Sequence, residues 1–205
     1  MRELPAGTFF GRTVRTWQTS ALAMSESVYE PHTVLAAHAH ARPYLCLVLQ
    51  GGHDETSGAD VRQCVPATVV VHPAGERHAN RFAPSGGRLF RLELDETWLT
   101  RCGGFDAPAQ FDGGPLSLLA NRIFREFRGP DDLSPLMIEA LAMEFAASTA
   151  RTRAAAAHRG EPAWLRRVQE YLHAHYAESI RLETLAGEAG VHAAHLNRAF
   201  RARHG

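Results

Sequence analysis

Two histidines separated by a single residue, His38 and His40, are well suited by type and spacing to bind a metal ion or a polar ligand. They lie in a segment that predicts a β-strand. Because successive side chains of a strand point to opposite faces, both imidazoles point to the same face. Imidazole nitrogen is a ligand for divalent metals such as Zn, Fe, Mn and Ni. A third histidine, His78, follows later in the segment Pro73-Ala-Gly75-Glu-Arg-His78.

The elements that position these histidines are predicted to be short β-strands. From about Thr13 to Leu94, apolar or alternating runs are separated by turn residues. Many short strands at this spacing are typical of an antiparallel sandwich or barrel. The predicted strands include Tyr44 to Leu49, Ala67 to Val71 and Leu89 to Leu94, with turns at Gly51-Gly52, Ser57-Gly58 and Pro84-Ser85-Gly86-Gly87.

Both histidine segments resemble the two motifs of cupin barrels. The first runs from His38 to Gly51 and has Tyr44 where the family has an acid; the second ends at His78. The resemblance implies that His38, His40 and His78 face one cavity and hold a divalent metal. In the alternative, these histidines and Tyr44 line an effector pocket without metal, because the missing carboxylate weakens the binding of hard cations.

Other polar residues of this region are weaker candidates. His72, beside Pro73, is typical of a surface histidine at a strand end rather than of a fourth ligand. Four arginines offer a site for an anionic effector, although solvation at the surface is the ordinary role for most such residues. They are Arg42, Arg77, Arg81 and Arg91.

The hydrophobic period changes after the predicted strands. Apolar residues from Leu116 to Phe127 recur at helical spacing and predict a helix near 114–128, and a second amphipathic helix is expected near 134–150. The pair either packs on its own barrel or joins a second subunit in a homodimer. Small and polar residues then predict a linker over 151–162, which separates a domain of residues 1–150 from one of residues 163–205.

Residues 182–200 have the spacing of a helix-turn-helix. Ala186 permits a close helix crossing, Gly190 suits a left-handed turn, and Val191 fills the gap between the helices. The second helix would then enter the major groove of DNA. Its outward face carries Ala194, Asn197, Arg198 and Arg201, where Asn pairs with adenine and Arg with guanine.

Residues 164–205 resemble the first half of an AraC-type DNA-binding domain, on the segments Leu-x-x-Leu-Ala and Leu-x-Arg-x-Phe and the closing Gly205. The resemblance implies base contacts from Ala194, Asn197 and Arg198 and a DNA-backbone contact from Arg201. His192 stands where the family has a capping Ser, so we expect a frayed start of that helix. The family carries a second helix-turn-helix after the glycine, so we expect a truncated module with weak, salt-sensitive DNA binding.

Composition limits the remaining classes. The 22 cations and 22 acids exclude a generally basic surface, and no stretch approaches the ~20 apolar residues of a membrane span. The three cysteines, an odd number at wide spacing, indicate reduced and mostly buried thiols rather than a disulfide framework or a zinc ribbon. With no recognisable signal peptide, we expect a cytoplasmic protein without membrane contact. The cysteines are Cys46, Cys64 and Cys102.

Together these features predict an α+β chain: a cupin-like antiparallel barrel, an amphipathic helix pair and an all-α helix-turn-helix segment. Such a chain would be a transcription regulator, not an enzyme, whose barrel senses a small molecule and whose partner is double-stranded promoter DNA. Two alternatives stay open. One is a metal-dependent cupin dioxygenase or isomerase with a helical appendage, and the other is a DNA-incompetent chain that dimerises with full-length regulators.

Overall fold

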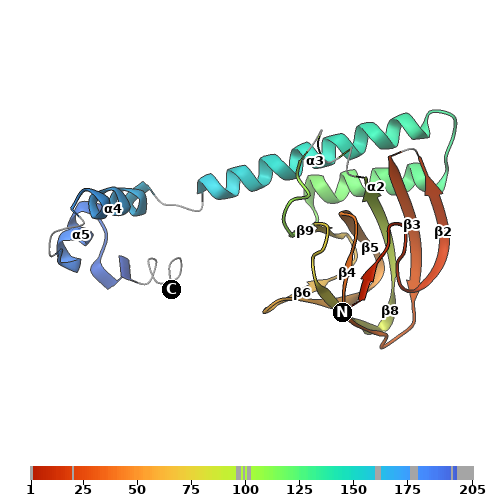
Figure 1. Cartoon of the computed structure of the whole chain (residues 1–205), viewed down its shortest axis with the longest axis horizontal. Helices are drawn as coiled ribbons and strands as arrows, with labels where there is room; N and C mark the ends of the chain where they lie inside the picture. Colours follow the sequence, from red (N-terminus) through yellow and green to blue (C-terminus); the bar gives the residue numbers. More distant parts are fainter. Residues whose placement is uncertain are drawn as a thin grey trace. The chain divides into compact units, whose positions relative to one another are not determined.

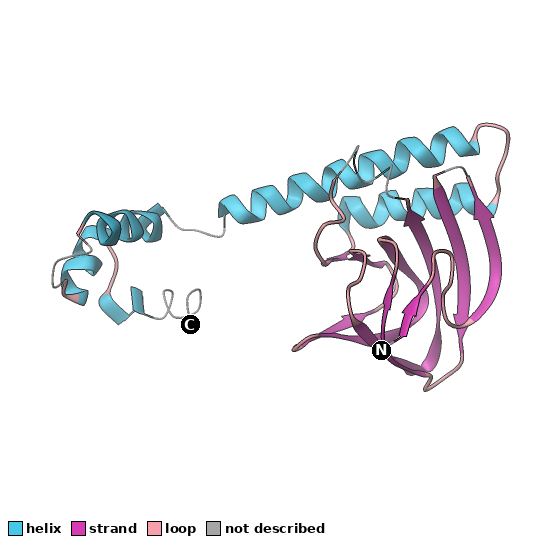
Figure 2. Cartoon of the chain, in the orientation of Figure 1, coloured by secondary structure: helices cyan, strands magenta, loops and turns pink. Residues whose placement is uncertain are grey.

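The computed structural model describes residues 2–19, 21–95, 98, 100, 103–159, 163–175, 180–194 and 196–197. The chain divides into two compact units, residues 1–151 and residues 152–205. Strands occupy the first part of the sequence and helices the second; Figure 2 draws the strands in magenta and the helices in cyan. The predicted α+β class is therefore confirmed.

Nine strands of the first unit form one sheet (Figure 1). The long strand β8 pairs antiparallel with β3, β4 and β5, and only the short pair β1 and β4 is parallel among the described strands. The sheet is mixed, and its described strands do not close into a ring, so the expected antiparallel barrel is an open one. The strands are β1 (Arg2–Leu4), β2 (Arg12–Gln18), β3 (Leu22–Tyr29), β4 (Val34–His40), β5 (Tyr44–Ser57), β6 (Asp60–Cys64), β7 (Thr68–His72), β8 (His78–Leu94) and β9 (Ala109–Asp112).

Two of the predicted turns lie inside strands. The segment Gly51-Gly52 is part of β5, and Pro84 to Gly87 is part of β8. Gly51 has a φ of 68°, and a Cβ added there would lie 2.1 Å from the carbonyl oxygen of Gly86. The register between β5 and β8 shifts on both sides of this point. The glycines therefore mark β-bulges that bend two long strands instead of ending them.

The two faces of the sheet have different roles. On β5, Leu45 and Leu47 pack toward the helices, while Tyr44, Cys46 and Val48 belong to a second cluster on the opposite, interior face. This alternation is the period of two that a strand imposes. The interior face carries the candidate site, and the other face forms the larger core.

Two helices cover the outer face of their own sheet: α2 (Gly114–Arg128) and α3 (Ser134–Arg159). They lie side by side in Figure 1, and Phe127 of α2 and Phe145 of α3 are fully buried in the core shared with the strands. Residues 151–159, assigned above to a linker, belong to α3. Alanine is the best helix former, and the run Ala154 to Ala157 has no Gly or Pro to interrupt it.

The second unit contains α4 (Ala163–Ala174), α5 (Leu182–Ala189) and a helical turn at residues 193, 194, 196 and 197. Its small core is formed by Val168, Ala186, Ala189 and Leu196. None of the described helices in either unit combines the length and the hydrophobicity needed to cross a bilayer.

Candidate functional site

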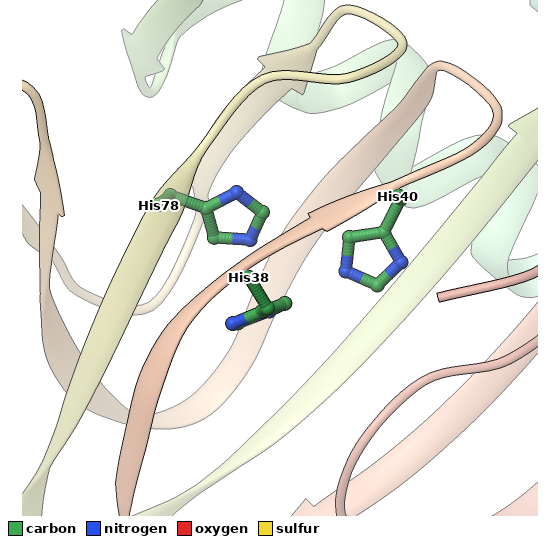
Figure 3. A group of neighbouring side chains, drawn as sticks. All are labelled: His38, His40 and His78. Carbon is green, nitrogen blue, oxygen red and sulfur yellow. The ribbon is translucent and has the colours of Figure 1, made fainter. Parts of the chain in front are cut away.

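The structure brings His38, His40 and His78 together on the interior face of the sheet, where Figure 3 shows the three rings grouped. His38 and His40 lie on β4, and His78, the first residue of β8, is paired with His38 in the strand register. One ring nitrogen of each lies within 4.8 Å of those of the other two. The side chains are buried, at 2%, 4% and 3% exposure.

Backbone carbonyls fix the orientation of two of these rings. Nδ1 of His38 lies 2.8 Å from the carbonyl oxygen of Ala36, and Nδ1 of His78 lies 3.2 Å from that of Glu76. Because a carbonyl oxygen can only accept, each Nδ1 carries the proton and each Nε2 keeps a free lone pair. A histidine held in this way by its other nitrogen is prepared to bind a metal through Nε2.

Tyr44 uses one of these lone pairs. Its hydroxyl lies 3.2 Å from Nε2 of His78, and since that nitrogen carries no proton, the tyrosine is the donor. Burial, and next to it the charge of Glu55, raises the pKa of Tyr44 well above its usual value, so the hydroxyl stays protonated. A metal at His78 would have to displace this hydrogen bond.

The imidazoles are neutral at physiological pH. Burial lowers the pKa of His40 to about 3 and that of His78 to about 2, and it also lowers the pKa of His38. Neighbouring imidazoles add to the effect, His38 on His40 and His72 on His78. Neutral imidazole is the form that binds metals, so these rings need not lose a proton before a cation binds, although the charge of the nearby Arg91 opposes that binding.

His72 is buried in this cluster, so its placement at the surface was wrong. It is 1% exposed, its ring stacks on Tyr44, and Nδ1 lies 2.8 Å from Oε2 of Glu76. The signal was available in the sequence: His72 ends a strand of valines, Thr68–His72, that is buried on both faces.

Glu55 is a second residue that the sequence did not reveal. Its buried carboxylate accepts a hydrogen bond from Asn80, and its Oε2 lies 3.5 Å from Nε2 of His72. Glu55, His72 and His78 form a second group whose ligand atoms lie within 4.8 Å of one another. Two imidazoles and one carboxylate are a ligand set typical of non-haem iron. The carboxylate absent at Tyr44 is thus available from Glu55, further along the same strand, β5.

The cavity between these side chains has a volume of about 20 Å³. That is room for about one water molecule and too little for an organic ligand. Two half-buried phenylalanines of the N-terminal segment, Phe9 and Phe10, close it: the ring of Phe9 stacks 4.6 Å from His40, and that of Phe10 meets His38 edge-on at 4.8 Å.

The four arginines differ in exposure. Arg77 and Arg81 are exposed, and the half-buried Arg42 lies 3.7 Å from the carboxylate of Glu93. Arg91, by contrast, is buried beside the histidines, so the surface role does not hold for it. Cys46 and Cys64 are free and buried, as expected, while Cys102 lies outside the described residues.

In the second unit the predicted turn is present. Gly190 ends α5 in the left-handed conformation, with φ 68° and ψ 32°. The backbone N–H of Val191 donates to the carbonyl of Ala186, and that of Gly190 to the carbonyl of Gly187, which together make a Schellman motif. At the start of the next helical turn, Nδ1 of His192 accepts the N–H of Ala194 at 3.2 Å, so the imidazole supplies a capping hydrogen bond in place of serine.

Two of the four predicted DNA-contacting residues are described. Ala194 and Asn197 are exposed on the helical turn that follows Gly190. Arg198 and Arg201 lie outside the described residues. The part of the predicted reading face that the structure describes is therefore open to solvent.

No protein-family model matches the sequence, and no curated protein matches it. Among solved structures, the AraC-like transcriptional activator CuxR matches 93% of this chain and 74% of its own, with 16% identity and a TM-score of 0.51. Unsaturated fatty acid bound wild-type ToxT from Vibrio cholerae strain SCE256 matches 90% of this chain and 74% of its own, with 8% identity and a TM-score of 0.52. Apo ToxT K231A from the same strain matches 92% of this chain and 77% of its own, with 7% identity and a TM-score of 0.52. The chain therefore shares its fold with the AraC-like activator CuxR and with ToxT.

Proposed function

We propose that this chain is a transcription regulator of AraC type, in which residues 1–151 sense a small molecule and residues 152–205 bind promoter DNA. The observation that carries the proposal is the fold shared with CuxR over 93% of the chain. A cytoplasmic location follows from this role.

DNA recognition is assigned to the helix that begins after Gly190. The Schellman motif fixes the angle between α5 and this helix, and the cap at His192 fixes its first turn. Asn197 then offers its amide to adenine, and Ala194 offers a methyl contact to thymine. Arg198 and Arg201 supply the cations in the proposal, Arg198 to a base and Arg201 to a phosphate.

We assign the sensing role to the first unit, residues 1–151, because buried polar side chains cluster on the interior face of its sheet. A purely structural core would be expected to have apolar side chains at such positions. An effector that binds one arrangement of the regulator better than another shifts DNA occupancy by that difference in affinity. The ToxT structure with a bound unsaturated fatty acid is a precedent for ligand binding in this fold. A homodimer is also proposed, supported by apolar residues that α2 and α3 leave exposed, namely Leu118, Leu136 and Met137.

The test is binding of the chain to DNA selected from a random pool, followed by fluorescence anisotropy. We expect weak, salt-sensitive but sequence-selective binding, and Asn197→Ala should weaken binding to the selected site by about 5- to 150-fold, the value of one bidentate base contact. Val61→Ala, at an exposed position of β6, is the control and should bind as the parent chain does. Equal affinity for selected and unrelated DNA would contradict the proposal.

As a second proposal, the interior cluster binds a divalent metal, with His38, His40 and His78 as ligands. A bound metal would also be consistent with the alternative of a cupin oxygenase. The second group, which contains Glu55 and His72, favours it because it adds a carboxylate. When bound, the ion would offer open coordination positions to a ligand or substrate.

The metal proposal is tested by Co²⁺ titration, read as visible absorption bands and stoichiometry. His78→Gln should abolish binding because both groups contain this residue. His40→Gln alone should abolish it if the three histidines are the ligands, whereas His72→Gln should do so if the carboxylate group is used. Parent protein that binds no Co²⁺ would exclude both, and turnover of an organic substrate by the metal-loaded chain would favour an enzyme.

A further inference from the structure

Three polar atoms on one part of the interior face have no hydrogen-bond partner among the described residues: Oγ of Ser25, Oγ of Ser27 and Nη1 of Arg91. All three side chains are buried, at 8%, 1% and 5% exposure. Ser25 of β3 is paired with Arg91 of β8 in the strand register, and Ser27 is two residues along β3 on the same face. Unsatisfied buried groups are uncommon in native proteins, and three on neighbouring positions indicate a missing partner.

The missing partner is an anion, because Arg91 carries a charge. Its Nη2 donates to the hydroxyl of Tyr29, and its guanidinium lies 4.6 Å from the ring centre of Phe9. No described carboxylate forms an ion pair with it, and Glu93, on the same face, is occupied by the N–H of Gly7 and by Arg42. An unpaired charge buried in this way is strongly unfavourable. A carboxylate matches the fork of a guanidinium and also accepts from serine hydroxyls.

A pocket of about 470 Å³ reaches Ser25 from the side of the hairpin formed by β2 and β3. Its volume falls in the range of small-molecule sites, and several of its lining residues are apolar. The ring of Phe9 lines both this pocket and the small histidine cavity that Arg91 lines. The same ring lies over the guanidinium of Arg91, so a ligand in the pocket would reach that charge by displacing the Phe9 side chain. The lining residues are Gly7, Phe9, Thr16, Trp17, Gln18, Ala23, Met24 and Ser25.

We infer that this pocket binds an organic carboxylate. The carboxylate accepts from Nη1 of Arg91 and from the hydroxyls of Ser25 and Ser27, and the apolar part of the ligand lies along Phe9 and Ala23. The inference rests on the proposed sensing role of the first unit, and it gives the effector a chemical class.

The experiment is isothermal titration of the full chain with acetate, benzoate and octanoate, each compared with the amide of the same shape. We expect at least one carboxylate to bind and its amide to bind at least tenfold more weakly, since hydrogen bonds to a charged group are the stronger ones. Ser25→Ala and Ser27→Ala should each weaken binding about tenfold, and Arg91→Gln should abolish it. Thr149→Val is the matched control, because Thr149 is also a buried hydroxyl without a partner in the described structure, but it lies on α3.

The two serine variants keep the test decisive if Arg91→Gln fails to fold, because they remove only a hydroxyl. Equal affinity for carboxylate and amide would overturn the inference, as would full affinity in the Ser25→Ala, Ser27→Ala double variant or no binding of any of the three acids. Failure of the regulator proposal gives a different result: the carboxylate binds as described, and the affinity of the chain for its selected DNA does not change.

Discussion

The two units place their polar side chains in opposite ways. In residues 1–151, five histidines are almost completely buried together with Glu55 and Arg91, whereas in residues 152–205 the described candidates for recognition, Ala194 and Asn197, are exposed. A buried polar group must be satisfied by its neighbours or by a ligand, but an exposed one is satisfied by water until a partner replaces it. Changes to polar residues should therefore alter stability in the first unit and affinity in the second. The five histidines are His38, His40, His53, His72 and His78.

The largest expected effect of this difference is on pH dependence. Burial lowers the pKa of His40, His53 and His78 to about 3, 4 and 2, well below the value near 6.5 of an unfolded chain. A lowered folded-state pKa means that stability is complete above about pH 6.5 and is lost as the pH falls toward the folded-state values. At pH 5 each group should remove about 2 kcal/mol from the first unit.

Hydrogen exchange, read by mass spectrometry on peptides of each unit in chelator-treated protein, measures this loss. Protection of the strands should fall between pH 7.5 and pH 5, after correction for the intrinsic exchange rate. Peptides of α4 and α5 should change less, because His175 and His192, the histidines of that unit whose exposure is described, are not fully buried. An equal change in both units would show that burial of the imidazoles is not the cause.

The next largest effect concerns the core that holds the sheet unit together. Phe127 is fully buried between α2 and the strands, so Phe127→Ala should lower the free energy of unfolding by about 3–5 kcal/mol. Arg122→Ala, at an exposed position of the same helix, should lower the free energy of unfolding by at most about 0.5 kcal/mol. Urea unfolding followed by circular dichroism compares the two. Similar losses would mean that the exposed face of α2 is also covered in solution.

Smaller effects on stability are expected from substitutions of two glycines in the second unit, and the two effects should have opposite signs. Gly190→Val forces a branched side chain into the left-handed conformation and should destabilise the unit by about 1–2 kcal/mol. Gly187→Ala, inside α5 with no atom within 4 Å of the added Cβ, should stabilise it by about 0.5–1 kcal/mol. Thermal melting followed at 222 nm together with exchange on the α5 peptide distinguishes the two signs. Equal effects would argue against the Schellman turn.

Much of the fold could be predicted from the sequence because it depends on local periodicity. The helical spacing of apolar residues from Leu116 to Phe127 predicted the bounds of α2 correctly. Gly190 correctly predicted the turn after α5, where the backbone is in the left-handed conformation. The end of α3 was missed because small residues were interpreted as a linker, although alanine favours a helix.

The candidate site was harder to predict because it depends on contacts between distant strands. Glu55 faces the histidines because the register between β5 and β8 shifts on either side of Gly51, so the inward-facing positions change from even-numbered, as at Tyr44, to odd-numbered. A count of alternating residues from Tyr44 cannot reveal such bulges. Arg91 looked like a surface residue because its sequence neighbours alternate between polar and apolar, and its burial follows from the strands and aromatic rings around it.

In the proposed metal site, the hydrogen bond from Tyr44 to His78 would make the interior cluster selective. A cation that binds there would first have to break a buried hydrogen bond, which would disfavour weakly coordinating ions such as Mg²⁺ and Ca²⁺ more than ions that bind imidazole strongly. A carboxylate in place of the tyrosine would remove this cost. By this reasoning, the single substitution Tyr44→Glu would leave Nε2 of His78 without this hydrogen bond and would add a carboxylate ligand.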